Sequence, residues 1–61
     1  MKITDHAEIR YILKRHGERV KHRDIVFEVN AKFRKHVEAA CMDEILAVIE
    51  KYKSLREFVG Q

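Results

Sequence analysis

The apolar residues between Val26 and Val59 recur at intervals that fit an α-helix. The first of them form a single stripe with steps of three, four, four, three and one residues, namely Val26, Val29, Phe33, Val37, Ala40 and Cys41. From Met42 onward the apolar residues cover most of the helical circumference, which is typical of a helix that is buried on several sides. Because the chain has no proline and two glycines, we expect an all-α fold in which residues 24–58 form a long helix.

Glu44 interrupts this pattern, because at ~100° per residue it falls on the same side of the helix as Val26 and Val37. Two arrangements remain open. The helix runs on, or it breaks near Cys41 and Asp43 caps a third helix. A continuous helix of residues 24–58 would be roughly 52 Å long at ~1.5 Å per residue, and no glycine or proline marks a break.

A shorter helix is predicted over residues 6–16. Asp5 is a typical N-cap residue, and Glu8, three residues later, is placed to bond back to the amide of the cap. Helical spacing continues through Ile9, Ile12 and Leu13. Gly17 then offers the left-handed conformation that often ends a helix.

An alternative interpretation makes residues 24–29 a β-strand. Ile25, Phe27 and Val29 alternate with other residues, and the segment is rich in β-branched and aromatic side chains. Since the chain has one such run, this strand would have to pair with the same strand of a second chain.

The chain's 61 residues allow one small domain, residues 1–61. Domains of this size often depend on disulfides, metals or oligomerisation for stability, and the single cysteine excludes an internal disulfide. We therefore expect a homodimeric helical bundle held together by the apolar second half. The predicted interface residues are Val37, Cys41, Ile45, Val48, Ile49, Tyr52 and Leu55.

The positive charge is concentrated in the first part of the chain. Residues 1–36 hold ten Lys or Arg against five Asp or Glu, whereas residues 37–61 hold three against five. A basic connector, residues 14–23, joins the two expected helices and supplies five cations: Lys14, Arg15, Arg19, Lys21 and Arg23. Because Lys and Arg neutralise phosphates, this loop predicts nonspecific nucleic-acid binding, although an ordinary solvated surface loop has the same composition.

Other functions are less well supported by the residues. No two of the four histidines have the i, i+4 spacing of a helical metal site, and Cys41 and Ser54 have no neighbouring base, so we expect no metal, no cofactor and no catalysis. The lone cysteine and the lack of an apolar leader or membrane span point to the cytoplasm. The alternative function is a small inhibitor or adaptor that binds a host protein, through residues 42–59 or through the basic loop.

Two partial resemblances add expectations. Residues 3–11, Ile-Thr-Asp-His-Ala-Glu-Ile-Arg-Tyr, resemble the opening of small phage- and prophage-borne proteins, which implies nucleic-acid binding or inhibition of a host protein. The pattern of Ile9, Ile12, Leu13, Lys14 and residues 17–20 resembles the first helix and loop of archaeal-type histones. That resemblance implies a DNA contact at Arg19, while the second-loop signature of the histones has no counterpart in this chain.

Overall fold

The computed structural model describes residues 3–59, and for Val59 the backbone alone. The described residues form four helices and no strand: α1 (His6–Gly17), α2 (His22–Phe33), α3 (Met42–Tyr52) and α4 (Leu55–Val59). The predicted all-α class is therefore confirmed. The alternative strand at residues 24–29 is wrong, because these residues lie within α2.

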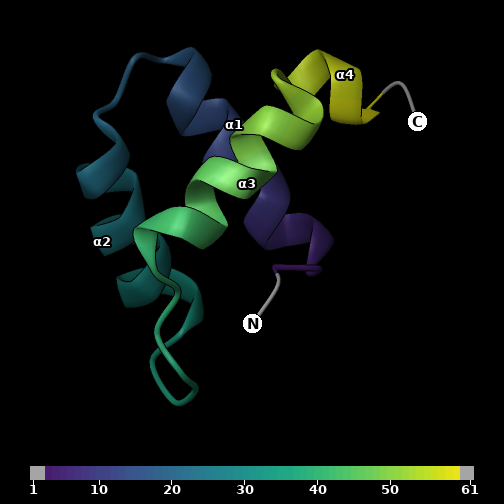
Figure 1. Ribbon diagram of the computed structural model, residues 1–61. Coiled ribbons are helices and arrows are strands. Elements are labelled where there is room, and N and C mark those ends of the chain that lie inside the picture. The colour runs from purple at the N-terminus through teal and green to yellow at the C-terminus, as the bar shows by residue number, and fades with distance from the viewer. Residues whose placement is uncertain (1–2, 60–61) are drawn as a thin grey trace.

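Helices α1, α2 and α3 pack against one another in all three pairings, and α4 packs against α1 and α3. Figure 1 shows α3 crossing in front of α1, with the short connector of residues 18–21 at one end of the molecule and the segment 34–41 at another. The side chains with the deepest burial come from all three long helices: Ile12 and Leu13, Ile25 and Val29, and Ile45. The core is thus enclosed by a single chain.

The first helix follows its predicted bounds closely. The Asp5 carboxylate accepts hydrogen bonds from the amides of Ala7 at 2.8 Å and Glu8 at 3.4 Å, as expected of an N-cap. Glu8, however, does not bond back to the amide of Asp5. Its carboxylate is buried and binds Arg34, a residue 26 positions away.

Of the two arrangements left open, the continuous helix over residues 24–58 is wrong, and a break before a third helix is observed. The helix stops at Phe33, an irregular segment follows, and α3 begins at Met42. Arg34 leaves the helix because its guanidinium bonds to both carboxylate oxygens of Glu8, at 2.6 and 3.1 Å, and to the carbonyl of Glu38 at 3.2 Å. These bonds turn the chain back toward α1.

Asn30 holds the C-terminal end of the irregular segment, residues 34–41. The side-chain amide of Asn30 accepts a hydrogen bond from the Ala40 amide at 2.8 Å and donates one to the Ala40 carbonyl at 3.0 Å. Cys41, not the expected Asp43, is the N-cap of α3, and Glu44 bonds to the Cys41 amide at 3.4 Å to complete a capping box. Glu44 therefore caps the third helix and does not lie on a continuous stripe.

Candidate nucleic-acid interface

The basic connector forms a tight turn between α1 and α2. At the end of α1 the Val20 amide donates to the Arg15 carbonyl at 3.2 Å, and the Arg19 amide donates to the His16 carbonyl at 3.0 Å. This is the hydrogen-bond pattern of a Schellman motif, which needs one residue in the left-handed conformation. That residue is Arg19, with φ of 64°, and not Gly17, which is the last residue of the helix.

The side chain of Arg15 is held in hydrogen bonds within the fold. Its guanidinium forms two bonds to Glu28 of α2, at 2.9 and 3.1 Å, and one to Glu18 at 2.7 Å. The phenol of Tyr11 donates to the same Glu28 carboxylate at 2.9 Å. The bond from Arg15, and next the bond from Tyr11, lower the pKa of Glu28. Arg15 thus fastens α1 to α2 and pairs with two acids near the connector.

The other four predicted cations, Lys14, Arg19, Lys21 and Arg23, are exposed, and none forms an ion pair with another described residue. Lys14 lies in the last turn of α1, Lys21 is the N-cap residue of α2, and Arg23 lies in its first turn. These four residues are called the free cations below. Arg15 does not bind Asp24, which also lies in the first turn of α2 and is adjacent in sequence to Arg23.

Between the end of α1 and the start of α2 the surface is hollowed into an open depression of about 400 Å³. It is lined by His16, Arg19, Val20, Lys21 and His22. The two imidazole rings lie 5.6 Å apart between centroids, with their planes 35° apart. The sequence does not predict this pairing, because six positions separate the two histidines and the turn that unites them leaves no spacing signature.

The predicted interface residues fall into two groups. Ile45, Val48 and Tyr52 lie in the core of their own chain, with exposed fractions of 0%, 6% and 8%. The expectation that these three face a second chain is therefore wrong for this fold. Val37 and Cys41 are exposed, and Ile49 and Leu55 are half-buried.

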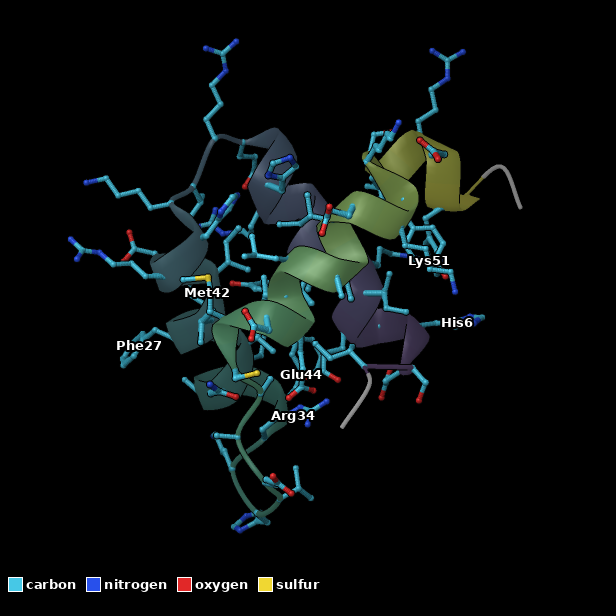
Figure 2. The ribbon with its side chains drawn as sticks, viewed as in Figure 1. His6, Phe27, Arg34, Met42, Glu44 and Lys51 are labelled. Atoms are coloured by element: carbon cyan, nitrogen blue, oxygen red, sulfur yellow. The ribbon has the colours of Figure 1, made fainter. Side chains whose placement is uncertain are left out.

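The buried Glu8–Arg34 pair and the outward-facing Phe27 were not foreseen from the sequence. The side chains of Glu8 and Arg34 are 5% and 6% exposed. The bond to Glu8 raises the pKa of Arg34, and the nearby charges of Glu44 and Glu38 act in the same direction. Phe27 points away from the rest of the molecule on the outer side of α2, with 75% of its surface exposed (Figure 2).

A second groove, of about 470 Å³, runs between the N-terminal segment and α3. Its walls combine apolar and charged side chains: Ile3, Thr4, Asp43, Glu44, Ala47, Val48, Lys51 and Tyr52. Within residues 3–59 no cluster of three or more metal-ligating side chains is found. The described helices are also too short or too polar to cross a membrane.

Comparisons of this chain with protein-family models, with curated proteins and with solved structures give no significant match. The resemblances to phage-borne proteins and to archaeal-type histones therefore stay predictions. The function has to be argued from the geometry of the connector.

Proposed function

We propose that this protein binds nucleic acid nonspecifically, by contacting backbone phosphates with Lys14, Arg19, Lys21 and Arg23. The proposal rests on one observation, the grouping of these free cations at one end of the molecule while Glu18 and Glu28 beside them are both bound by Arg15. A patch of this kind attracts phosphates through the release of bound counterions.

The backbone of Arg19 supports this assignment. A residue with a side chain is strained at φ of 64°, and glycine is the usual occupant of this position in a Schellman motif. Strain of this kind is concentrated at functional sites, where the side chain is needed for another purpose. An arginine held there projects from the turn at the centre of the connector.

The test compares two double variants that each remove two positive charges. Arg19→Gln with Lys21→Gln alters the connector, whereas Lys35→Gln with Arg56→Gln alters exposed cations outside it. Binding of a DNA duplex and of an RNA hairpin is measured by fluorescence anisotropy over a series of salt concentrations. Each lost phosphate contact should reduce the slope of log K against log salt by about 0.9, so the connector variant should lose roughly 2.

The control variant should retain the slope of the wild type and lose affinity by less than the connector variant. The proposal fails if the wild type binds neither nucleic acid, if its binding does not respond to salt, or if the two double variants weaken binding equally. Since the contacts are to phosphates, the loss in the connector variant should be similar for unrelated sequences.

A second candidate function is binding to another protein, and the exposure of Phe27 and Val37 favours it. Aromatic side chains are enriched in protein interfaces, and a phenylalanine exposed on a helix has no role in the core of its own chain. Substitution Phe27→Ser should abolish a specific protein complex that survives nuclease treatment, without lowering the melting temperature. Retention of the complex by the variant would exclude Phe27 from the interface.

Homodimer formation remains part of the first proposal, with two copies presenting two connectors to one duplex. Of the predicted interface, Val37, Cys41, Ile49 and Leu55 are still accessible. Sedimentation equilibrium at micromolar concentration should give twice the chain mass, and Val37→Asp should shift it toward the mass of one chain. A single-chain mass for the wild type would remove the dimer from the proposal.

A further inference from the structure

The depression in the connector brings together four groups that carry or accept positive charge. Arg19 and Lys21 have permanent charges, and His16 and His22 face each other with ring centroids 5.6 Å apart. Val20 is the fifth lining residue, and no acidic side chain of the described residues lines the hollow. His16 is half-buried, whereas Arg19, Lys21 and His22 are exposed at its edge.

This composition favours an anion over a metal ion. A zinc site needs three or four ligands, and here two imidazoles stand beside two fixed positive charges that repel a cation. The described residues contain no third metal ligand near the pair. Two cations and two imidazole nitrogens are instead suitable donors for the oxygens of a phosphate.

The side chains around this open depression favour one kind of phosphate over another. A backbone phosphodiester has one negative charge and is tied to the strand on both sides, so it contacts the exposed edge more readily than the half-buried His16. A phosphate monoester has a free end with three oxygens and about −1.5 to −2 charges near neutral pH. It is the better match for the two cations and two imidazoles that line an open depression of about 400 Å³.

We propose that this depression is a binding site for a phosphate monoester, such as the terminal 5′-phosphate of a nucleic-acid strand. The inference rests on the proposed function, since it adds a preferred ligand end to the same connector. The free cations outside the hollow, Lys14 and Arg23, would then hold the following backbone phosphates.

The charges around the depression also favour a dianion. Charged groups in the surrounding elements are Lys14 and Arg15 of α1, Glu18 of the connector, and Arg23 and Asp24 of α2. Glu18 is bound to Arg15, so the positive charges prevail around the two rings. A dianion in the depression therefore lies among more positive than negative charges.

The experiment uses the full chain and three ligands: an oligonucleotide with a 5′-phosphate, the same oligonucleotide with a 5′-hydroxyl, and a nucleoside 5′-monophosphate. We expect the phosphorylated strand to bind roughly tenfold more tightly than its hydroxyl counterpart, about the effect of one charge-assisted hydrogen bond. Saturable binding of the monophosphate alone supports the same site and shows that the monoester is recognised without the strand.

His22→Gln should remove the preference for the phosphorylated strand and leave binding of the hydroxyl strand unchanged. His36→Gln, in the segment 34–41 at another end of the molecule, is the matched control and should retain the preference (Figure 1). His16→Gln is a second variant that should act like His22→Gln, and circular dichroism checks that each variant is folded.

Equal binding of the two strands overturns the monoester site and leaves nonspecific phosphate binding standing. Failure of both strands to bind overturns both proposals. A response of the His16 and His22 ring signals in NMR spectra to zinc, without a response to the monophosphate, would also overturn the inference, because the pair would then be a metal site.

Discussion

Replacing Arg19 by glycine should make the protein more stable and at the same time a weaker ligand for nucleic acid. Arg19 occupies the left-handed position of the turn that closes α1, with φ of 64°. A residue with a Cβ atom is disfavoured in this conformation, and glycine is not. The side chain of Arg19 also has no ion-pair partner among the described residues, so its removal breaks no salt bridge.

The size of the effect follows from two opposing contributions. Relief of the left-handed strain contributes roughly 1–2 kcal/mol. The greater freedom of glycine in the unfolded chain costs roughly 0.5–1 kcal/mol. The net expectation is a gain of roughly 0–1.5 kcal/mol in the free energy of unfolding, centred on about 0.75 kcal/mol. Loss of one phosphate contact should lower the salt slope of nucleic-acid binding by about 0.9.

The chain provides a matched control in Lys53, which follows α3 and has φ of 62°. Lys53→Gly removes the same charge from another residue of positive φ, with ψ of −33°, outside the connector. It should also raise stability, because glycine tolerates positive φ, but it should leave the salt slope unchanged. Urea unfolding followed by circular dichroism measures the first quantity, and anisotropy titrations measure the second.

Two results would refute the reasoning. A lower free energy of unfolding for Arg19→Gly would show that the arginine side chain stabilises the turn. An unchanged salt slope would show that Arg19 does not contact phosphate, even if the gain in stability is observed. The two measurements therefore test the strain and the function separately.

Three further predictions concern the bonds that fasten the helices. Glu8→Gln should cost roughly 3–5 kcal/mol in urea unfolding, because it leaves the buried Arg34 charge uncompensated, while Glu8→Leu with Arg34→Met should recover most of the loss. Arg15 and Tyr11 lower the pKa of Glu28, so the Glu28 carboxylate should stabilise the fold above about pH 4.3. This stabilisation should be lost as the pH falls through the lowered pKa. Glu28→Gln should remove this step from an acid titration of stability. Asn30→Ala should cost roughly 1–3 kcal/mol and speed proteolysis within residues 34–41, because the amide and carbonyl of Ala40 lose their partner.

Local patterns were sufficient to predict the first helix. An N-cap aspartate, helical spacing of Ile9, Ile12 and Leu13, and a glycine at the end define it, and the structure places α1 at His6–Gly17. Each of these signals acts between residues within a few positions of one another. The all-helical class could be predicted for the same reason, since the spacing of apolar residues fixes the helical face whichever partner covers it.

The break after Phe33 could not be predicted in this way. Neither glycine nor proline marks it, and Arg34 is a good helix former in isolation. The helix ends because Arg34 bonds to Glu8 and Asn30 bonds to Ala40, and both interactions depend on how the helices pack. With the break, α3 can fold back onto α1 and α2, and the chain encloses a core that a single long helix would have left open.

In the candidate site, too, one property can be predicted from the sequence and another depends on the fold. The positive charges of residues 14–23 are visible in the sequence, but their availability is decided by partners that lie elsewhere in the chain. Arg15 binds Glu28, 13 residues away, and this pairing leaves Lys14, Arg19, Lys21 and Arg23 as the free cations. An Arg15→Gln variant should therefore weaken nucleic-acid binding because it loosens the turn and leaves Glu18 and Glu28 unpaired beside the free cations, while its salt slope should match that of the wild type. A slope reduced by about 0.9, with stability unchanged, would place Arg15 among the phosphate contacts and show that its bonds to Glu28 and Glu18 open on binding.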